Sequence, residues 1–134
     1  MTTQTSPNFL VIQADQMAAS ALSAYGNPFT RTPHIDALGA AGTVFRNSYF
    51  AFPLCGPSRA SRMPGQLPSR IRAYDNAAEL SSEIPTFAHY LRARGYQTSL
   101  SGKMHFVGAD QLRGFERRLT SDIYTGDFYW TETL

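Results

Sequence analysis

Residues 8–14 read Asn-Phe-Leu-Val-Ile-Gln-Ala, and they carry the clearest fold signal in this 134-residue chain. The apolar run from Phe9 to Ile12 does not alternate with polar residues, and Asp15 and Gln16 follow it closely. Such a run is typical of a strand buried on both faces, as strands are in a parallel sheet. We therefore predict an α/β fold with a mainly parallel sheet flanked by helices.

Further helix and strand signals alternate along the chain. Thr32 and Pro33 form a helix start, and Gly42 can end that helix. A second helix is predicted from Pro85 to Arg94, because apolar residues recur in it at helical spacing. Further strands are predicted at residues 43–50 and 96–100, and a loop at residues 65–69. Helices that alternate with strands favour parallel connections and support the α/β class.

Polar residues follow the predicted strands. Asp15 comes after the first strand, Cys55 a few residues after the second, and Lys103 and His105 after the third. In open α/β sheets the ligand crevice lies at the carboxyl ends of the strands. We therefore expect these residues to meet at one edge of the sheet. Taken singly, each has a plainer explanation: a helix cap for Asp15, and an exposed lysine and a structural histidine for the other pair.

Composition limits the possible classes of function. Hydrophobic residues make up 43% of the chain, which suits a globular protein, and the net charge of +2 is too small to indicate a nucleic-acid or membrane partner. The apolar run at residues 9–12 is too short for a signal-peptide core or a transmembrane helix. With one cysteine and no disulfide framework, we expect a soluble, cytoplasmic protein.

The single cysteine lies in the stretch Cys55-Gly56-Pro57-Ser58-Arg59. A lone cysteine cannot close an intramolecular disulfide, which leaves packing, metal binding or reactivity as its purpose. Pro57 suits the first position of a helix. The positive end of that helix, together with Arg59, would stabilise negative charge near Cys55.

The pattern Cys-x-Pro-x-Arg resembles the modification signature of the type I sulfatases, in which the cysteine is oxidised to the aldehyde formylglycine. The resemblance runs from Pro7 to about Trp130 and implies an alkaline-phosphatase-like fold. It also implies that residues 1–134 are the N-terminal part of one catalytic domain, with the remainder absent or on another chain. The stretches that resemble choline sulfatases in particular are residues 65–70, 74–79, 100–105, 110–112, 114–116 and 120–124.

The resemblance implies a catalytic role for Cys55, Arg59, Lys103 and His105. Formylglycine hydrate made from Cys55 would attack sulfur and then expel sulfate as the aldehyde re-forms. A plain serine could not take that last step. Arg59 would hold the hydrate, Lys103 would bind the sulfate oxygens, and His105 would assist the elimination.

The resemblance also implies a divalent cation, expected to be Ca²⁺, with Mn²⁺ or Mg²⁺ as alternatives. Its ligands would be Asp15, Gln16 and the modified Cys55. The family has two aspartates where this chain has Asp15-Gln16. Because ligand charge tunes the affinity for hard cations, the missing carboxylate leaves the identity of the metal open.

The expected reaction is the hydrolysis of choline-O-sulfate to choline and sulfate. Trp130 lies in an aromatic stretch and is predicted to bind the trimethylammonium group, while Lys103 and His105 bind the sulfate. Alternatively, these aromatic residues fill a core or an interface. Other candidate functions are an arylsulfatase, a phosphonate or phosphate ester hydrolase, and an inactive fragment with a binding or assembly role. Expected partners are a small sulfate ester, a formylglycine-generating enzyme, a completing chain and further copies in a homo-oligomer.

Overall fold

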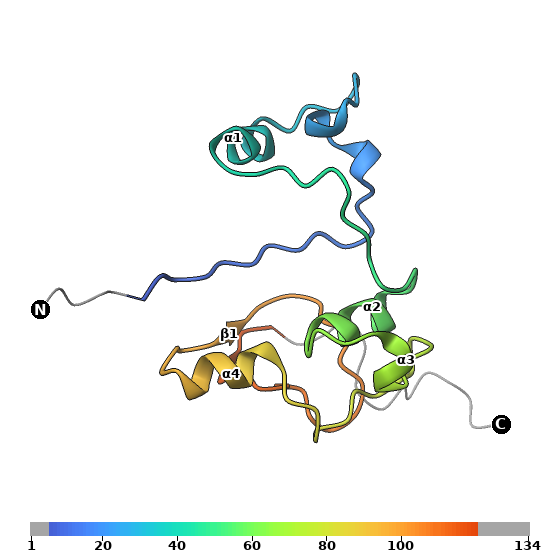
Figure 1. Ribbon diagram of the computed structural model, residues 1–134, viewed down its shortest axis with the longest axis vertical. Helices are drawn as coiled ribbons and strands as arrows, with labels where there is room; N and C mark the ends of the chain where they lie inside the picture. The colour runs from blue at the N-terminus through green and yellow to red at the C-terminus, as the bar shows by residue number, and fades with distance from the viewer. Residues whose placement is uncertain (1–5, 121–134) are drawn as a thin grey trace, which may run out of the picture. The chain divides into compact units, whose positions relative to one another are not determined.

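The computed structural model of the protein describes residues 6–120 (Figure 1). The chain divides into two compact units, Met1–Ser48 and Tyr49–Leu134. The first unit holds the 3₁₀ helices η1 (Ala19–Ala21) and η2 (Ser23–Tyr25) and the helix α1 (Pro33–Ala41). The second unit holds the helices α2 (Cys55–Arg62), α3 (Pro68–Ile71) and α4 (Phe87–Ala93) and the strands β1 (Ser99–Leu100) and β2 (Arg117–Arg118). Among residues 6–120, no helix has the length and apolar character that crossing a bilayer requires.

Helix α1 confirms the prediction made from Thr32, Pro33 and Gly42, which are its N-cap, first residue and C-cap. Its first turn is bonded to the preceding 3₁₀ helix through Asp36. Ser23 Oγ donates to Asp36 Oδ2 at 2.7 Å, and Thr32 Oγ1 donates to Asp36 Oδ1 at 3.2 Å. A carboxylate in the first turn is favoured by the helix dipole, so the same contact stabilises the start of α1.

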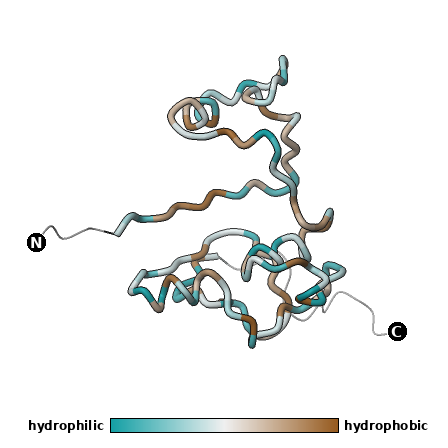
Figure 2. The backbone as a smooth tube through the Cα atoms, viewed as in Figure 1, coloured by the Kyte–Doolittle hydropathy of each residue, from teal (hydrophilic) through white to brown (hydrophobic). Residues whose placement is uncertain are grey.

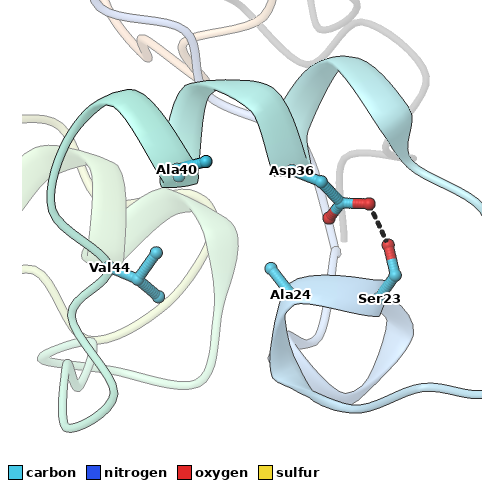
Figure 3. Close-up of a pocket in the computed structure, with 6 residues that line it drawn as sticks. Ser23, Ala24, Asp36, Ala40 and Val44 are labelled. Atoms are coloured by element: carbon cyan, nitrogen blue, oxygen red, sulfur yellow. Dashed lines mark hydrogen bonds between the residues drawn. The ribbon is translucent and has the colours of Figure 1, made fainter.

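An open hollow lies beside this contact in the first unit, and Figure 3 shows its lining. Both carboxylate oxygens of Asp36 already accept hydrogen bonds from Ser23 and Thr32. The hollow therefore presents mainly small apolar side chains, and no predicted site residue lines it. Its lining residues are Ser23, Ala24, Asp36, Gly39, Ala40 and Val44.

The strands predicted at residues 8–14 and 43–50 are wrong for the described part of the chain. The sheet found there pairs β1 with β2, and neither predicted segment belongs to it. Phe9 and Leu10 are 64% and 85% exposed. Figure 2 shows an apolar stretch of the tube near the N-terminal end. A strand requires a neighbour that exchanges backbone hydrogen bonds with it, and an apolar run alone does not supply one.

The sheet of the second unit confirms the parallel orientation. Strand β1 lies beside β2 with Ser99 opposite Arg117 and Leu100 opposite Arg118. The predicted strand at residues 96–100 is thus shortened to its last two residues. Strand β2 was not predicted, because two adjacent arginines lack the apolar pattern of a strand.

Two helices of the second unit, α2 and α4, differ from the predictions only at their ends, and a third, α3, was not predicted. Helix α2 begins at Cys55, two residues before the predicted start at Pro57. Helix α4 is shorter than the predicted helix from Pro85 to Arg94, because Thr86 is its N-cap and Arg94 its C-cap. The Thr86 N–H donates to His89 Nδ1 at 3.1 Å. Helix α3 occupies part of the predicted loop at residues 65–69, since Pro68 takes a first-turn position that suits proline.

A small hydrophobic core holds the second unit together. Phe87 of α4 and Phe115 pack edge to face, with ring centroids 5.7 Å apart. Edge-to-face packing is a geometry that aromatic pairs prefer. This contact joins α4 to the segment that leads into β2. The buried members of the core are Ala60, Met63, Ile71, Ala73, Leu80, Ala88, Leu100, Phe106 and Phe115.

Arg113 connects three segments around this core and is only 1% exposed. Its guanidinium donates to the carbonyl of Leu80 and, at 2.8 Å, to the carbonyl of Val107. It also pairs with Glu79 at 3.2 Å. A buried guanidinium needs such acceptors to offset its lost hydration, so it fixes the loops that supply them.

Candidate active site

Cys55 lies at the N-terminus of a helix, as the sequence predicted. It is the first residue of α2, half-buried, and a free thiol. The next residue, Gly56, donates its backbone N–H to Asn76 Oδ1 at 2.9 Å. The amide groups and dipole of a helix N-terminus stabilise negative charge, so this position suits a reactive or anion-binding side chain.

Arg59 follows one turn later and connects α2 to the predicted lysine–histidine segment. The residue is 4% exposed, and Nη1 donates to the carbonyl oxygen of Lys103 at 2.5 Å. The same nitrogen lies 4.0 Å from the sulfur of Met104. Sequence reasoning expected Arg59 to act on the group at residue 55, and it did not foresee this link across 44 residues.

His105 is buried, at 5% exposure, and its ring faces the loop that follows α3. Its Nε2 lies 3.0 Å from the backbone oxygen of Asn76. Since a carbonyl oxygen only accepts hydrogen bonds, Nε2 is the donor. Lys103, two residues earlier, is half-buried. Within the second unit, hydrogen bonds from Gly56, Arg59 and His105 thus link the helix that begins with Cys55 to residues 103–105, in part through Asn76.

The backbone at His105 is left-handed, with φ of 60°. Lys103 and His105 are two residues apart, a spacing that places side chains on the same side only along an extended chain, and His105 does not have an extended backbone. A left-handed conformation outside glycine costs on the order of 1–3 kcal/mol and tends to persist where surrounding contacts hold it. The contact with Asn76 is one such constraint on His105.

One further residue, outside the predicted set of site residues, contacts both the start of α2 and His105. Asn76 accepts from Gly56 through its side chain and from His105 through its backbone carbonyl. It lies in the predicted stretch at residues 74–79, but one asparagine in a turn-rich segment is no signal for a functional contact. Only the folded structure shows that Asn76 contacts both Gly56 at the start of α2 and His105.

Two of the three predicted metal ligands, Asp15 and Gln16, belong to the first unit, whereas Cys55 belongs to the second. Asp15 and Gln16 are exposed, and Gln16 has a left-handed backbone with φ of 54°. Carboxylate and amide oxygens suit a hard cation such as Ca²⁺, which takes about six to eight oxygen ligands. Residues 6–120 contain no cluster of three or more histidine, cysteine, aspartate or glutamate side chains able to hold a metal. The donor chemistry therefore fits, but the described residues do not complete a site.

Trp130, the predicted contact for the choline group, lies outside the described residues. Its role stays a prediction, as do the roles of the other predicted site residues. Of the predicted site residues, the structure describes Asp15 and Gln16 in the first unit, and Cys55, Arg59, Lys103 and His105 in the second.

Comparison with known proteins shows the family to which this chain belongs. The profile of the sulfatase family matches residues 7–132, and the chain belongs to that family. It is similar to the choline-sulfatase of Rhizobium meliloti (strain 1021), with 56% identity over 93% of this chain and 24% of that protein. It is also similar to human arylsulfatase A, with 40% identity over 84% of this chain and 25% of the relative.

A solved structure of a 2-O GAG sulfatase matches with a TM-score of 0.74 and 32% identity, covering 89% of this chain and 27% of that one. This likeness confirms the predicted sulfatase-like α/β fold class. The resemblance to choline sulfatases in particular is supported by the higher identity. The chain spans about a quarter of the length of the curated relatives it matches.

Proposed function

We propose that these residues form the N-terminal part of a choline-O-sulfatase, which hydrolyses choline-O-sulfate to choline and sulfate. The observation that carries the proposal is the set of hydrogen bonds that links the helix beginning at Cys55 to residues 103–105. A cysteine within a Cys-x-Pro-x-Arg signature begins a helix, and that helix is bonded through Arg59 to Lys103. The 56% identity to a choline-sulfatase favours choline as the alcohol.

The residues of this chain would divide the work as follows. Formylglycine made from Cys55 would supply a hydrated aldehyde. Its first hydroxyl would lose a proton and attack sulfur, and choline would leave as its S–O bond breaks and its oxygen gains a proton. The second hydroxyl would then lose its proton, so that the aldehyde re-forms and sulfate leaves. Lys103 would hold sulfate oxygens, since an ammonium group stabilises an anion as its charge shifts. His105 would exchange a proton with the reacting oxygens. Arg59 would keep the helix of Cys55 in register with Lys103 through their hydrogen bond.

A divalent cation would be bound in part by Asp15 and Gln16, and it would act as a Lewis acid toward the sulfate group. Their carboxylate and amide oxygens are ligands that such a cation prefers. Trp130 would contact the trimethylammonium group of choline.

The test uses the complete protein, expressed together with a formylglycine-generating enzyme. Mass spectrometry of the peptide that contains Cys55 should show the aldehyde. Turnover should be greater with choline sulfate than with aryl sulfates or phosphonates. The Cys55→Ser variant keeps a hydroxyl nucleophile but cannot re-form an aldehyde. We expect it to lose steady-state turnover by about a thousandfold or more.

The rival functions give different results in the same experiment. Preference for an aryl sulfate or a phosphonate would assign the protein to another activity of the superfamily. An unmodified Cys55 in a protein with full activity would refute the formylglycine mechanism. Absence of turnover on every ester would favour a binding or assembly role.

A further inference from the structure

We propose that Asn76 is a positioning residue of this site, holding the helix that begins with Cys55 at a fixed spacing from His105. The inference rests on the proposed sulfatase function. Asn76 accepts the Gly56 N–H through Oδ1 at 2.9 Å, and its own carbonyl lies 3.0 Å from His105 Nε2. One residue thus bonds the start of α2 with its side chain and the histidine with its backbone.

The contact of Asn76 with α2 supplies an acceptor for the Gly56 N–H, which has none within the helix. Amides in the first turn of a helix have no intrahelical acceptor, and the N-cap residue Leu54 makes no side-chain cap. Asn76 Oδ1 takes this role from 20 residues away. Because the Gly56 amide directly follows Cys55, the hydrogen bond fixes the backbone that carries the cysteine.

Glycine at position 56 is explained by this same contact. A Cβ there would lie 3.0 Å from Asn76 Cα and 3.1 Å from Asn76 Oδ1. Gly56 is not among the glycines of positive φ, so backbone conformation does not require glycine here. The absence of a side chain instead lets the Asn76 backbone approach the helix closely.

The segment around Asn76 is held on both sides. Before it, Asp75 Oδ1 accepts the Ala77 N–H at 2.9 Å, which closes a tight turn around Asn76. After it, Arg113 binds the side chain of Glu79 and the carbonyl of Leu80. Since Asn76 belongs to a braced segment, its two hydrogen bonds can set the distance between Cys55 and His105.

This role predicts a loss in kcat with little change in KM. A shift of about 1 Å in a reacting group can cost about a hundredfold in rate. Asn76→Ala removes Oδ1, releases the Gly56 amide and should lower kcat by about tenfold to a hundredfold, with KM within about threefold of wild type. Asn76→Asp keeps an acceptor oxygen at the same place and should retain kcat to within about tenfold.

One further measurement and two further variants complete the experiment in the complete protein. Mass spectrometry of residue 55 shows whether each variant carries the aldehyde, so rates are compared per modified site. Asn27→Ala is the matched control, because Asn27 caps a turn of the first unit with Oδ1 accepting from Phe29 at 2.9 Å and Thr30 at 3.0 Å. It should leave kcat unchanged. Gly56→Ala adds a Cβ that would lie 3.0 Å from Asn76 Cα, so that the Asn76 backbone must shift away from α2. This variant should lower kcat without raising KM.

The results separate this inference from the proposed function. Wild-type kcat in Asn76→Ala, or equal losses in Asn76→Ala and Asn76→Asp, would overturn the positioning role. A rise in KM that matches the loss in kcat/KM would assign Asn76 to substrate binding and would overturn it as well. Should Asn76→Ala not fold, Gly56→Ala decides the matter, and wild-type kcat in that variant refutes the inference. A wild-type protein without the aldehyde or without sulfatase turnover would instead refute the proposed function.

Discussion

At the scale of single residues, Arg59 shows how a side chain can join two parts of a site. It is 4% exposed, and its guanidinium reaches the carbonyl of Lys103, 44 residues further along the chain. The guanidinium is a rigid, planar group with several N–H donors, whereas a lysine ammonium is a compact charge on a flexible stem. The hydrogen bond from residue 59 to the Lys103 carbonyl therefore depends on the shape and length of the arginine side chain as well as on its charge.

Arg59→Lys in the complete protein should lower the free energy of unfolding by about 1.5–3 kcal/mol, because a hydrogen bond from a charged group is lost inside the fold. Denaturant unfolding measures the change. Arg62→Lys is the control, since Arg62 lies in the same helix but is exposed, and it should change stability by less than about 0.5 kcal/mol. Equal effects of the two substitutions would show that the link from Arg59 to Lys103 adds nothing to stability.

At the scale of elements, helix α2 hides most of the signature that it contains. Gly56, Pro57 and Arg59 are buried, while Cys55 is half-buried. Under the proposed function, the modifying enzyme would need to reach the proline and the arginine of this signature, which are buried in the folded helix. Formation of α2 and oxidation of Cys55 should therefore exclude each other in time.

We predict that oxidation of Cys55 precedes the folding of α2. A peptide of residues 49–65 should be converted to formylglycine by a formylglycine-generating enzyme, because its backbone is free to extend. The folded protein, prepared with the thiol intact, should stay unmodified under the same conditions. Mass spectrometry of residue 55 over time measures both rates. Conversion of the folded protein as fast as the peptide would mean that α2 opens readily.

At the scale of the whole molecule, the apolar run at residues 9–12 is the clearest unmet expectation. Val11 and Ile12 are 60% and 80% exposed, and the run belongs to no sheet among the described residues. Apolar side chains gain stability only when they leave water, at about 25 cal/mol per Å². The sequence pattern of a central strand would be satisfied if the rest of a sulfatase domain covered both faces.

Leu10→Asp tests that expectation in the complete protein. If Leu10 lies in a buried strand there, a carboxylate in its place should lower the free energy of unfolding by about 3 kcal/mol or more. Phe29→Asp is the control, because Phe29 lies in the same unit, 91% exposed and outside any predicted strand. Equal and small effects in thermal or denaturant unfolding would show that residues 9–12 are not buried.

Much of the candidate site could be predicted because its signals are local. The spacing of Cys55 and Arg59 and the proline between them are properties of five adjacent residues, and the helix start there follows from proline's fixed φ. The strands at residues 8–14 and 43–50 could not be predicted reliably, because a strand depends on distant neighbours. Strand β2 was missed for the same reason, since its arginines pair with β1 only in the folded chain.

Residue types at short spacing were enough to predict the family, the position of Cys55 at a helix start, and the helices α1 and α4. These depend on residue types at short spacing, where sterics and local hydrogen bonds decide. Tertiary structure alone decided that Arg59 bonds to Lys103 and that Asn76 contacts both Gly56 and His105. Such contacts join residues 20 to 44 positions apart, and they form only when packing of the core pays the entropy of closing those loops.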